Sequence, residues 1–235
     1  MNNQAKGILI TGIGVLALIP DSLIIRLVDE ATMTVAFWRA GLSGLAITIF
    51  LLLTRGPKSM LSFSLPALLF AGCYAINTIL YVVALSLTSV AATVFLLATA
   101  PVWALIISRL FLKEALNIRM ILTVIFTLIG IGIIAMGSSM NFGAILGNLA
   151  ALGVAISLAT AFTIARASPN ISMIPATALS YLVAAIAVTP FVASYTLEPT
   201  DWPKMLILGG ALLPLATCLM AIGPQYITSA EVGLF

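Results

Sequence analysis

The chain contains no histidine, only two cysteines and very few charges. Charged residues make up 7% of the 235 positions, whereas hydrophobic residues make up 62% and the mean hydropathy is +1.24. The absence of histidine excludes HExxH zinc proteases and hydrolases that activate a nucleophile with imidazole. Cys73 and Cys218 both lie in apolar segments, where a thiol is more often a packing group than a metal ligand. We therefore predict no metal site, no cofactor and no enzymatic activity.

The few positive charges are also too scattered to form a binding face for nucleic acid. The ten lysine and arginine residues stand singly at the ends of apolar segments, whereas phosphate recognition needs basic residues clustered on one face. No GxxxxGK[ST] segment is present, which excludes ATP as an energy source within this chain. We therefore expect no nucleic-acid partner, and so apolar a composition instead predicts the lipid bilayer as a partner.

In place of polar surface, the sequence has a series of apolar segments, each about 20 residues long. A helix of roughly 20 residues crosses a hydrocarbon layer about 30 Å thick, so this length predicts membrane spans. Eight full spans and the start of a ninth near Ser229 are predicted, at 8–28, 33–54, 66–87, 90–112, 118–137, 143–165, 173–195 and 205–223. We expect an all-α integral membrane protein built as a polytopic helix bundle.

The loop charges predict the orientation of this bundle. With the N-terminus in the cytoplasm, seven of the ten cations fall on the cytoplasmic side, where basic loop residues are enriched in membrane proteins. These cations are Lys6, Arg55, Lys58, Arg109, Lys113, Arg119 and Arg166. The acidic residues that collect on the outer side are Asp29, Glu30, Glu198 and Asp201. An N-terminus in the cytoplasm is therefore expected.

One constant offset along the sequence, equal to the distance from Thr88 to Thr228, indicates an internal duplication. This offset, here called the repeat offset, lays the first three apolar segments on the sixth to eighth. The same offset lays Thr88-Ser89 on Thr228-Ser229 and Phe95 on Phe235. Each unit holds five spans, an odd number, so the second unit would enter the membrane from the opposite face. We predict two inverted five-helix units, the first at 1–138 and the second, incomplete one at 139–235.

Several motifs resemble those of EamA-type members of the drug/metabolite transporter superfamily. The matching segments are Gly7 to Asp21, Phe37-Trp38-Arg39, ALSLTSVAA at 84–92, Ala100-Pro101-Val102 and Phe111-Leu112-Lys113-Glu114, and the second unit repeats the third of these as QYITSAEV at 225–232. The chain breaks off before the second unit's counterparts of Pro101 and Glu114, so we expect nearly two spans to be missing.

The resemblance implies a carrier of small metabolites in the inner (plasma) membrane, with a central cavity lined by helices of both units. Its expected activity is secondary active transport, as export or exchange, of solutes such as amino acids. Alternating access would come from the inverted repeats. The alternative is a non-transporting membrane scaffold or an inactive fragment of such a carrier.

Two charges, Asp21 and Arg39, lie well inside predicted spans rather than at their ends. At 1.5 Å per residue both lie roughly 10 Å below the same membrane face, so their side chains can meet. Because an ionised group at this depth is costly unless paired or hydrated, a pair or a shared polar cavity is favoured. The pair could simply lock two spans together, or Arg39 could anchor a carboxylate while Asp21 serves as its partner or as a proton carrier. A third possibility is that Arg39 extends to the interface.

The remaining candidates are polar or aromatic residues of the other spans. Tyr74, Asn77 and Tyr81 share one helical face, which either bonds a neighbouring helix or lines the pathway. The candidate substrate-binding residues are Asp21, Trp38, Arg39, Tyr74, Asn77, Tyr81, Asn148 and Gln225, and the candidate proton-coupling residues are Asp21 and Glu231. Trp38 could instead be a packing group or an interface anchor, and Glu231 could merely contact interfacial water. Glycines such as Gly41 and Gly44 indicate close helix packing, within one chain or across a homodimer.

Overall fold

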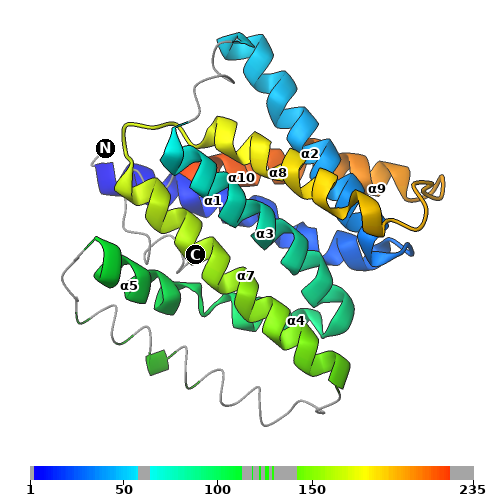
Figure 1. Ribbon diagram of the computed structural model, residues 1–235, viewed down its shortest axis with the longest axis horizontal. Helices are drawn as coiled ribbons and strands as arrows, with labels where there is room; N and C mark the ends of the chain where they lie inside the picture. Colours follow the sequence, from blue (N-terminus) through cyan, green and yellow to red (C-terminus); the bar gives the residue numbers. More distant parts are fainter. Residues whose placement is uncertain are drawn as a thin grey trace.

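The computed structural model describes residues 3–57, 64–112 and 142–222, together with single positions between 118 and 129. All regular structure in these residues is helical (Figure 1). Seven segments are long and apolar enough to cross a membrane: Gly7–Leu27, Thr32–Arg55, Leu65–Leu87, Val90–Phe111, Ala144–Ala167, Ile174–Phe191 and Trp202–Ile222. They match seven of the eight predicted full spans. The predicted span at 118–137 is described only at single positions, and the one near Ser229 lies outside the described residues.

The first three spans are continuous helices: α1 (Asn3–Leu27), α2 (Thr32–Arg55) and α3 (Leu65–Leu87). α1 continues through Pro20, although proline removes one backbone donor from the helix. α3 begins with proline in its first turn, where the missing N–H would have no intrahelical partner.

The predicted span at 90–112 consists of two helices, α4 (Val90–Leu97) and α5 (Ala100–Phe111). The Ser89 side chain caps α4 by accepting a hydrogen bond from the backbone N–H of Ala92 at 3.1 Å. The break falls at Ala98 and Thr99, directly before Pro101 in the first turn of α5. Proline is tolerated at this position but disfavours a helix that continues into it.

The second half begins with α7 (Phe142–Ala167) and α8 (Ile174–Val188). The prediction that the span continues to Tyr195 is wrong, because α8 ends in a 3-10 turn, η2 (Thr189–Phe191), and residues 192–201 are not helical. Pro190 accounts for this early end, since its ring conflicts with continuation of an α-helix. The last described span joins α9 (Trp202–Ile207), a π-turn, η3 (Leu208–Leu212), and α10 (Leu213–Ile222).

The helices pack in a consistent set of pairs. α2 packs against α8, α3 against α7 and α8, α1 against α10, and α2 against η3, while α4 and α5 lie along α7 (Figure 1). Glycines allow close approach at three of these contacts. A Cβ added at Gly44 would lie 2.8 Å from the Leu182 side chain, and one at Gly153 would lie 2.8 Å from Leu80. At Gly209 the added atom would lie 2.8 Å from Leu42. These glycines therefore bring helices together within one chain.

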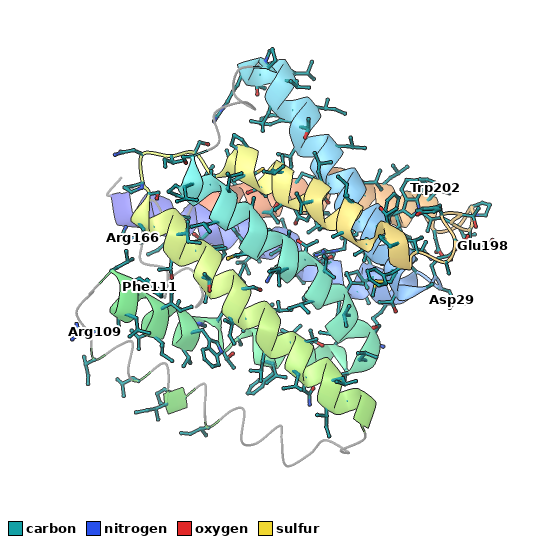
Figure 2. All side chains as sticks on the ribbon, in the orientation of Figure 1. Asp29, Arg109, Phe111, Arg166, Glu198 and Trp202 are labelled. Atoms are coloured by element: carbon teal, nitrogen blue, oxygen red, sulfur yellow. The ribbon has the colours of Figure 1, made fainter. Side chains whose placement is uncertain are left out.

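Charged residues separate between the two ends of the bundle. Asp29 and Glu198 lie at one end, here called the acidic end, and Arg109 and Arg166 lie at the other, here called the basic end (Figure 2). The surface between them is apolar, with residues such as Leu53 and Ile186 more than 70% exposed. Such a surface is suited to lipid rather than to water.

Candidate functional site

Asp21 of α1 and Arg39 of α2 form a buried, two-point ion pair. Nε of Arg39 donates to Oδ1 of Asp21 at 3.1 Å, and Nη2 donates to Oδ2 at 2.7 Å. The two residues are only 3% and 4% exposed. This geometry is the strongest form of an arginine–carboxylate contact, and each charge compensates the other in an apolar surrounding. The predicted encounter of these side chains is confirmed, and the extension of Arg39 to the interface is wrong.

A cavity of about 70 Å³ adjoins this pair, and we call it the ion-pair cavity. Its lining combines the pair with aromatic, amide, hydroxyl and aliphatic groups. The lining residues are Leu18, Asp21, Arg39, Tyr74, Asn77, Thr78, Tyr81, Leu97, Val154, Leu158, Tyr181, Leu213, Thr217 and Met220. The ion pair therefore borders a space that is lined by residues from both halves of the chain.

The polar face of α3 points into this cavity. Arg39 lies over the ring of Tyr81, with 5.3 Å between the guanidinium carbon and the ring centroid, which is a cation–π distance. Asn77 lines the cavity and also donates through Nδ2 to the carbonyl of Val154 in α7 at 3.0 Å. Both interpretations of this face therefore apply at Asn77, which lines the cavity while bonding a neighbouring helix.

Two cavity residues of the second half, Tyr181 and Thr217, were not among the sequence candidates. Tyr181 of α8 is 1% exposed and packs edge-on against Tyr74, with ring centroids 6.0 Å apart. The repeat offset lays Asn77 on Thr217 of α10 and Leu18 on Leu158, and all four residues line the cavity. This offset would therefore have found Thr217 and Leu158, whereas no sequence pattern marks Tyr181.

The other sequence candidates lie elsewhere. The indole N–H of Trp38 donates to the carbonyl of Tyr195 at 3.0 Å, near the acidic end and outside the cavity lining. Oδ1 of Asn148 accepts a hydrogen bond from the Thr88 hydroxyl at 3.0 Å, at the junction of α3 and α4. Gln225 and Glu231 lie outside the described residues. Among the described residues, no group of three or more histidine, cysteine or acidic side chains could hold a metal ion.

A solved structure described as "Crystal structure of protein" has the same fold. It aligns with a TM-score of 0.77 and 17% sequence identity over 98% of this chain and 83% of its own. At this level of identity the likeness concerns the fold alone. No curated protein matches the chain.

The family model that matches the chain covers residues 22–136 and describes the EamA-like transporter family. This segment contains Arg39 and the four polar residues of α3 that line the cavity, and Asp21 directly precedes it. The resemblance indicated by the sequence motifs is therefore confirmed, because residues 22–136 match the model of the EamA-like transporter family.

Proposed function

We propose that this chain is a secondary active transporter, an exporter or exchanger, of small organic metabolites such as amino acids across the inner membrane. The observation that carries the proposal is a buried ion pair bordering a cavity lined by residues of α1, α2, α3, α4, α7, α8 and α10. A pair that only locked α1 to α2 would need no polar and aromatic space beside it. The EamA-like family match and the seven apolar helices support the same function.

Within this site, Arg39 would anchor a carboxylate and Asp21 would carry a proton. Guanidinium has five N–H donors, of which two are engaged by Asp21 in the closed pair. A substrate carboxylate that bound Arg39 in place of Asp21 would leave an uncompensated aspartate in an apolar surrounding, and protonation would relieve its cost. The cavity volume of about 70 Å³ is well below the roughly 300–1,000 Å³ typical of small-molecule pockets, so binding of a metabolite requires the surrounding helices to separate.

Alternating access would come from two inverted units at 1–138 and 139–235. The repeat offset lays α1 on α7, α2 on α8 and α3 on the span that ends with α10. The contact of α1 with α10 is therefore equivalent to the contact of α7 with α3, and the contact of α2 with α8 is equivalent to itself. The close contact of Gly153 with Leu80 has a near counterpart at Gly14, which approaches Met220. The repeat offset lays Leu80 on Met220, and Gly14 is one position from the residue that it lays on Gly153. This exchange of equivalent contacts supports the inverted-repeat arrangement.

The distribution of charge supports a cytoplasmic N-terminus. α1 begins at the basic end, which carries Arg109 and Arg166, and the acidic end carries Asp29 and Glu198 (Figures 1 and 2). Because basic residues are enriched on the cytoplasmic side, the basic end would face the cytoplasm.

Transport by the purified chain in proteoliposomes tests the proposed function. Exchange of radiolabelled amino acids and related metabolites is measured for the wild type and for Asp21→Asn, Arg39→Gln and Arg55→Gln. We expect exchange by the wild type and at least about a tenfold loss in the two ion-pair variants, because each removes one charge of the substrate site. Arg55→Gln is the matched control, since Arg55 is exposed and its contact to Ser172 is long, at 3.4 Å.

Two results would contradict the proposal. Undiminished exchange by both ion-pair variants at normal expression would assign the pair a purely structural role. Absence of exchange by the wild type with every solute, and with the protein correctly inserted, would favour the scaffold alternative.

A further inference from the structure

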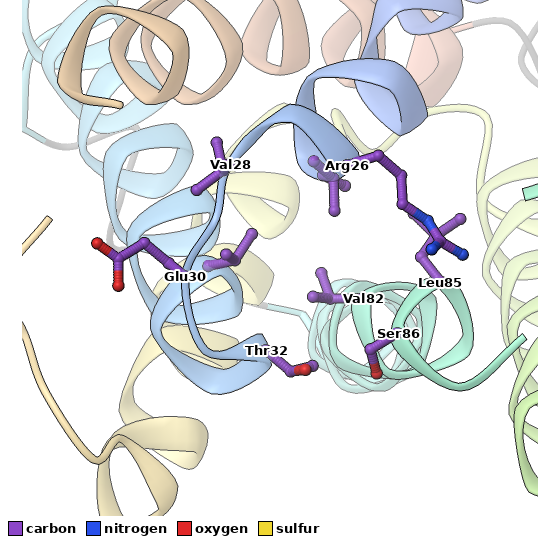
Figure 3. Close-up of a pocket in the computed structure, with 9 residues that line it drawn as sticks. Arg26, Val28, Glu30, Thr32, Val82, Leu85 and Ser86 are labelled. Atoms are coloured by element: carbon purple, nitrogen blue, oxygen red, sulfur yellow. The ribbon is translucent and has the colours of Figure 1, made fainter. Parts of the chain in front are cut away.

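A second and larger pocket, of about 140 Å³, lies between the ion-pair cavity and the acidic end. The end of α1, the start of α2 and the end of α3 form its walls, as Figure 3 shows. We call it the acidic-end pocket. Nothing in the transport site described above uses it.

The acidic-end pocket lies directly above the ion pair on the same three helices. Its lining residues Ile25, Val35 and Leu85 are each four residues from an ion-pair cavity residue, namely Asp21, Arg39 and Tyr81, respectively. Residues four apart share one face of a helix and are separated by one turn, about 5.4 Å along the axis. In all three helices this turn leads toward the acidic end, since α1 and α3 end there and α2 begins there.

Among the described residues, the buried side chains that line this pocket one turn from the ion-pair cavity are aliphatic. Ile25, Val35, Val82 and Leu85 are 8%, 3%, 2% and 1% exposed, and none of their side chains can bond water. A narrow apolar layer of this kind excludes water and polar solutes until it widens, as hydrophobic constrictions do in channels. The two spaces therefore lie in series along one path, with these four side chains, here called the aliphatic layer, as a closed barrier between them.

The two charged groups of the acidic-end pocket, Glu30 and Arg26, differ in whether they can bond a ligand inside the pocket. The Glu30 carboxylate points away from α3 in Figure 3 and accepts a hydrogen bond from the backbone N–H of Glu198 at 3.0 Å. The guanidinium of Arg26 lies on the side of α3, where Nη2 donates to the carbonyl of Thr88 at 2.5 Å. One hydrogen bond leaves most of its five donors for other partners. The hydroxyl of Ser86 lies on the same wall.

We propose that the acidic-end pocket is an outer vestibule that binds the transported solute through its carboxylate, and that the aliphatic layer is the outer gate. Arg26 receives the carboxylate in the vestibule before or after Arg39 holds it in the ion-pair cavity. This inference rests on the proposed function. The inference adds a second binding position, a gate and a requirement for a carboxylate at the outer mouth to the proposed function.

Thiol labelling of the full chain tests the gate without requiring transport. In a Cys73→Ala and Cys218→Ala background, Ser86→Cys reports on the vestibule and Thr78→Cys on the ion-pair cavity. A membrane-impermeant maleimide is added to the outer face of oriented vesicles. We expect rapid labelling of Ser86→Cys and slow labelling of Thr78→Cys, because the aliphatic layer lies between the two positions.

Opening the layer is expected to connect the two spaces. Adding Leu85→Ala should accelerate labelling of Thr78→Cys by about tenfold, because truncation widens the apolar constriction. The control Leu87→Ala lies on the same helix but is 42% exposed, so it should leave the labelling rate unchanged. If Leu85→Ala does not yield folded protein, Val82→Ala removes fewer atoms from the same layer. Equal effects of the layer and control variants would overturn the gate, as would slow labelling of Ser86→Cys from the outer face.

The ligand class is tested by protection of Ser86→Cys with butyrate, and with butyramide, which has a similar shape but no charge. We expect butyrate alone to slow labelling, and Arg26→Gln to remove this protection. Equal protection by both compounds, or none by either, would overturn the carboxylate site. Loss of exchange in the transport assay with this labelling pattern intact would instead contradict only the proposed transport function.

Discussion

At the residue scale, the molecule depends on two charges that compensate each other. Removing one partner of a buried pair leaves an unpaired charge, which costs about 3–5 kcal/mol, whereas removing both leaves only a loss of packing. The hydrogen bonds at 2.7 and 3.1 Å make Asp21 and Arg39 strongly coupled in this sense. Stability and transport should therefore respond differently to single and double substitution.

We predict that Asp21→Asn and Arg39→Gln each lower the thermal unfolding midpoint in detergent, and that the double variant recovers most of the loss. The double-mutant coupling energy should be about 2–3 kcal/mol. The same double variant should remain inactive in the exchange assay, because both charges of the substrate site are absent. Simple additivity of the two single effects would show that the charges do not act as a pair, and full activity of the double variant would make the pair structural.

The Asp21–Arg39 pair could be predicted from the sequence, because both charges lie at the same depth below one membrane face and have few other partners at that depth. The three-and-four spacing of Tyr74, Asn77 and Tyr81 likewise determines a common face. Tyr181 could not be predicted, because one aromatic residue in an apolar span has no periodic partner to mark its direction. Trp38, in contrast, does not line the cavity, although it directly precedes Arg39 in the sequence. Adjacent residues on a helix do not share a face, and Trp38 bonds the Tyr195 carbonyl.

At the element scale, the non-helical segment 192–201 joins the second half of the chain to the start of α2. The Thr34 hydroxyl donates to the carbonyl of Ser194 at 2.8 Å, and the Trp38 indole donates to the carbonyl of Tyr195 at 3.0 Å. The rings of Phe37 and Tyr195 are 5.1 Å apart. Hydropathy did not predict this segment, because Phe191, Val192 and Ala193 continue the apolar pattern after Pro190 has ended the helix.

We predict that Thr34→Val combined with Trp38→Phe releases this segment from α2 without unfolding the bundle. Each change removes a hydrogen bond worth about 1 kcal/mol, so local opening should increase about tenfold or more. Thr34→Val keeps the shape of the side chain, and Trp38→Phe keeps one aromatic ring. Hydrogen exchange of the backbone amides at 194–198 measures the opening. The control Thr54→Val removes a hydroxyl that bonds only within its own helix, to the Phe50 carbonyl, and should leave these amides unchanged. Unchanged exchange in the double variant would show that other contacts hold the segment.

At the scale of the whole molecule, equivalent residues of the two proposed units should lie on opposite sides of the membrane. The repeat offset lays Arg26 on Arg166, at the ends of α1 and α7, respectively. Arg26 contacts Thr88 at the acidic end, where α7 begins near Asn148, and Arg166 lies at the basic end (Figure 2). The lengths of the apolar segments predict the spans but not how the two halves are arranged in space. The positions of Arg26 and Arg166 at opposite ends of the bundle provide that relation.

We predict that, in a cysteine-free background, Arg26→Cys reacts with an impermeant maleimide on intact cells, whereas Arg166→Cys reacts only after permeabilisation. The reason is that an odd number of spans in each proposed unit would reverse the second unit, so that residues related by the repeat offset would lie on opposite sides of the bilayer. Asp29→Cys and Glu198→Cys are matched controls from opposite halves and should both react on intact cells, since both lie at the acidic end. Labelling of Arg26→Cys and Arg166→Cys from the same side would contradict inverted units and remove the basis for alternating access. The reverse assignment of all four positions would retain the inverted units and contradict only the cytoplasmic N-terminus.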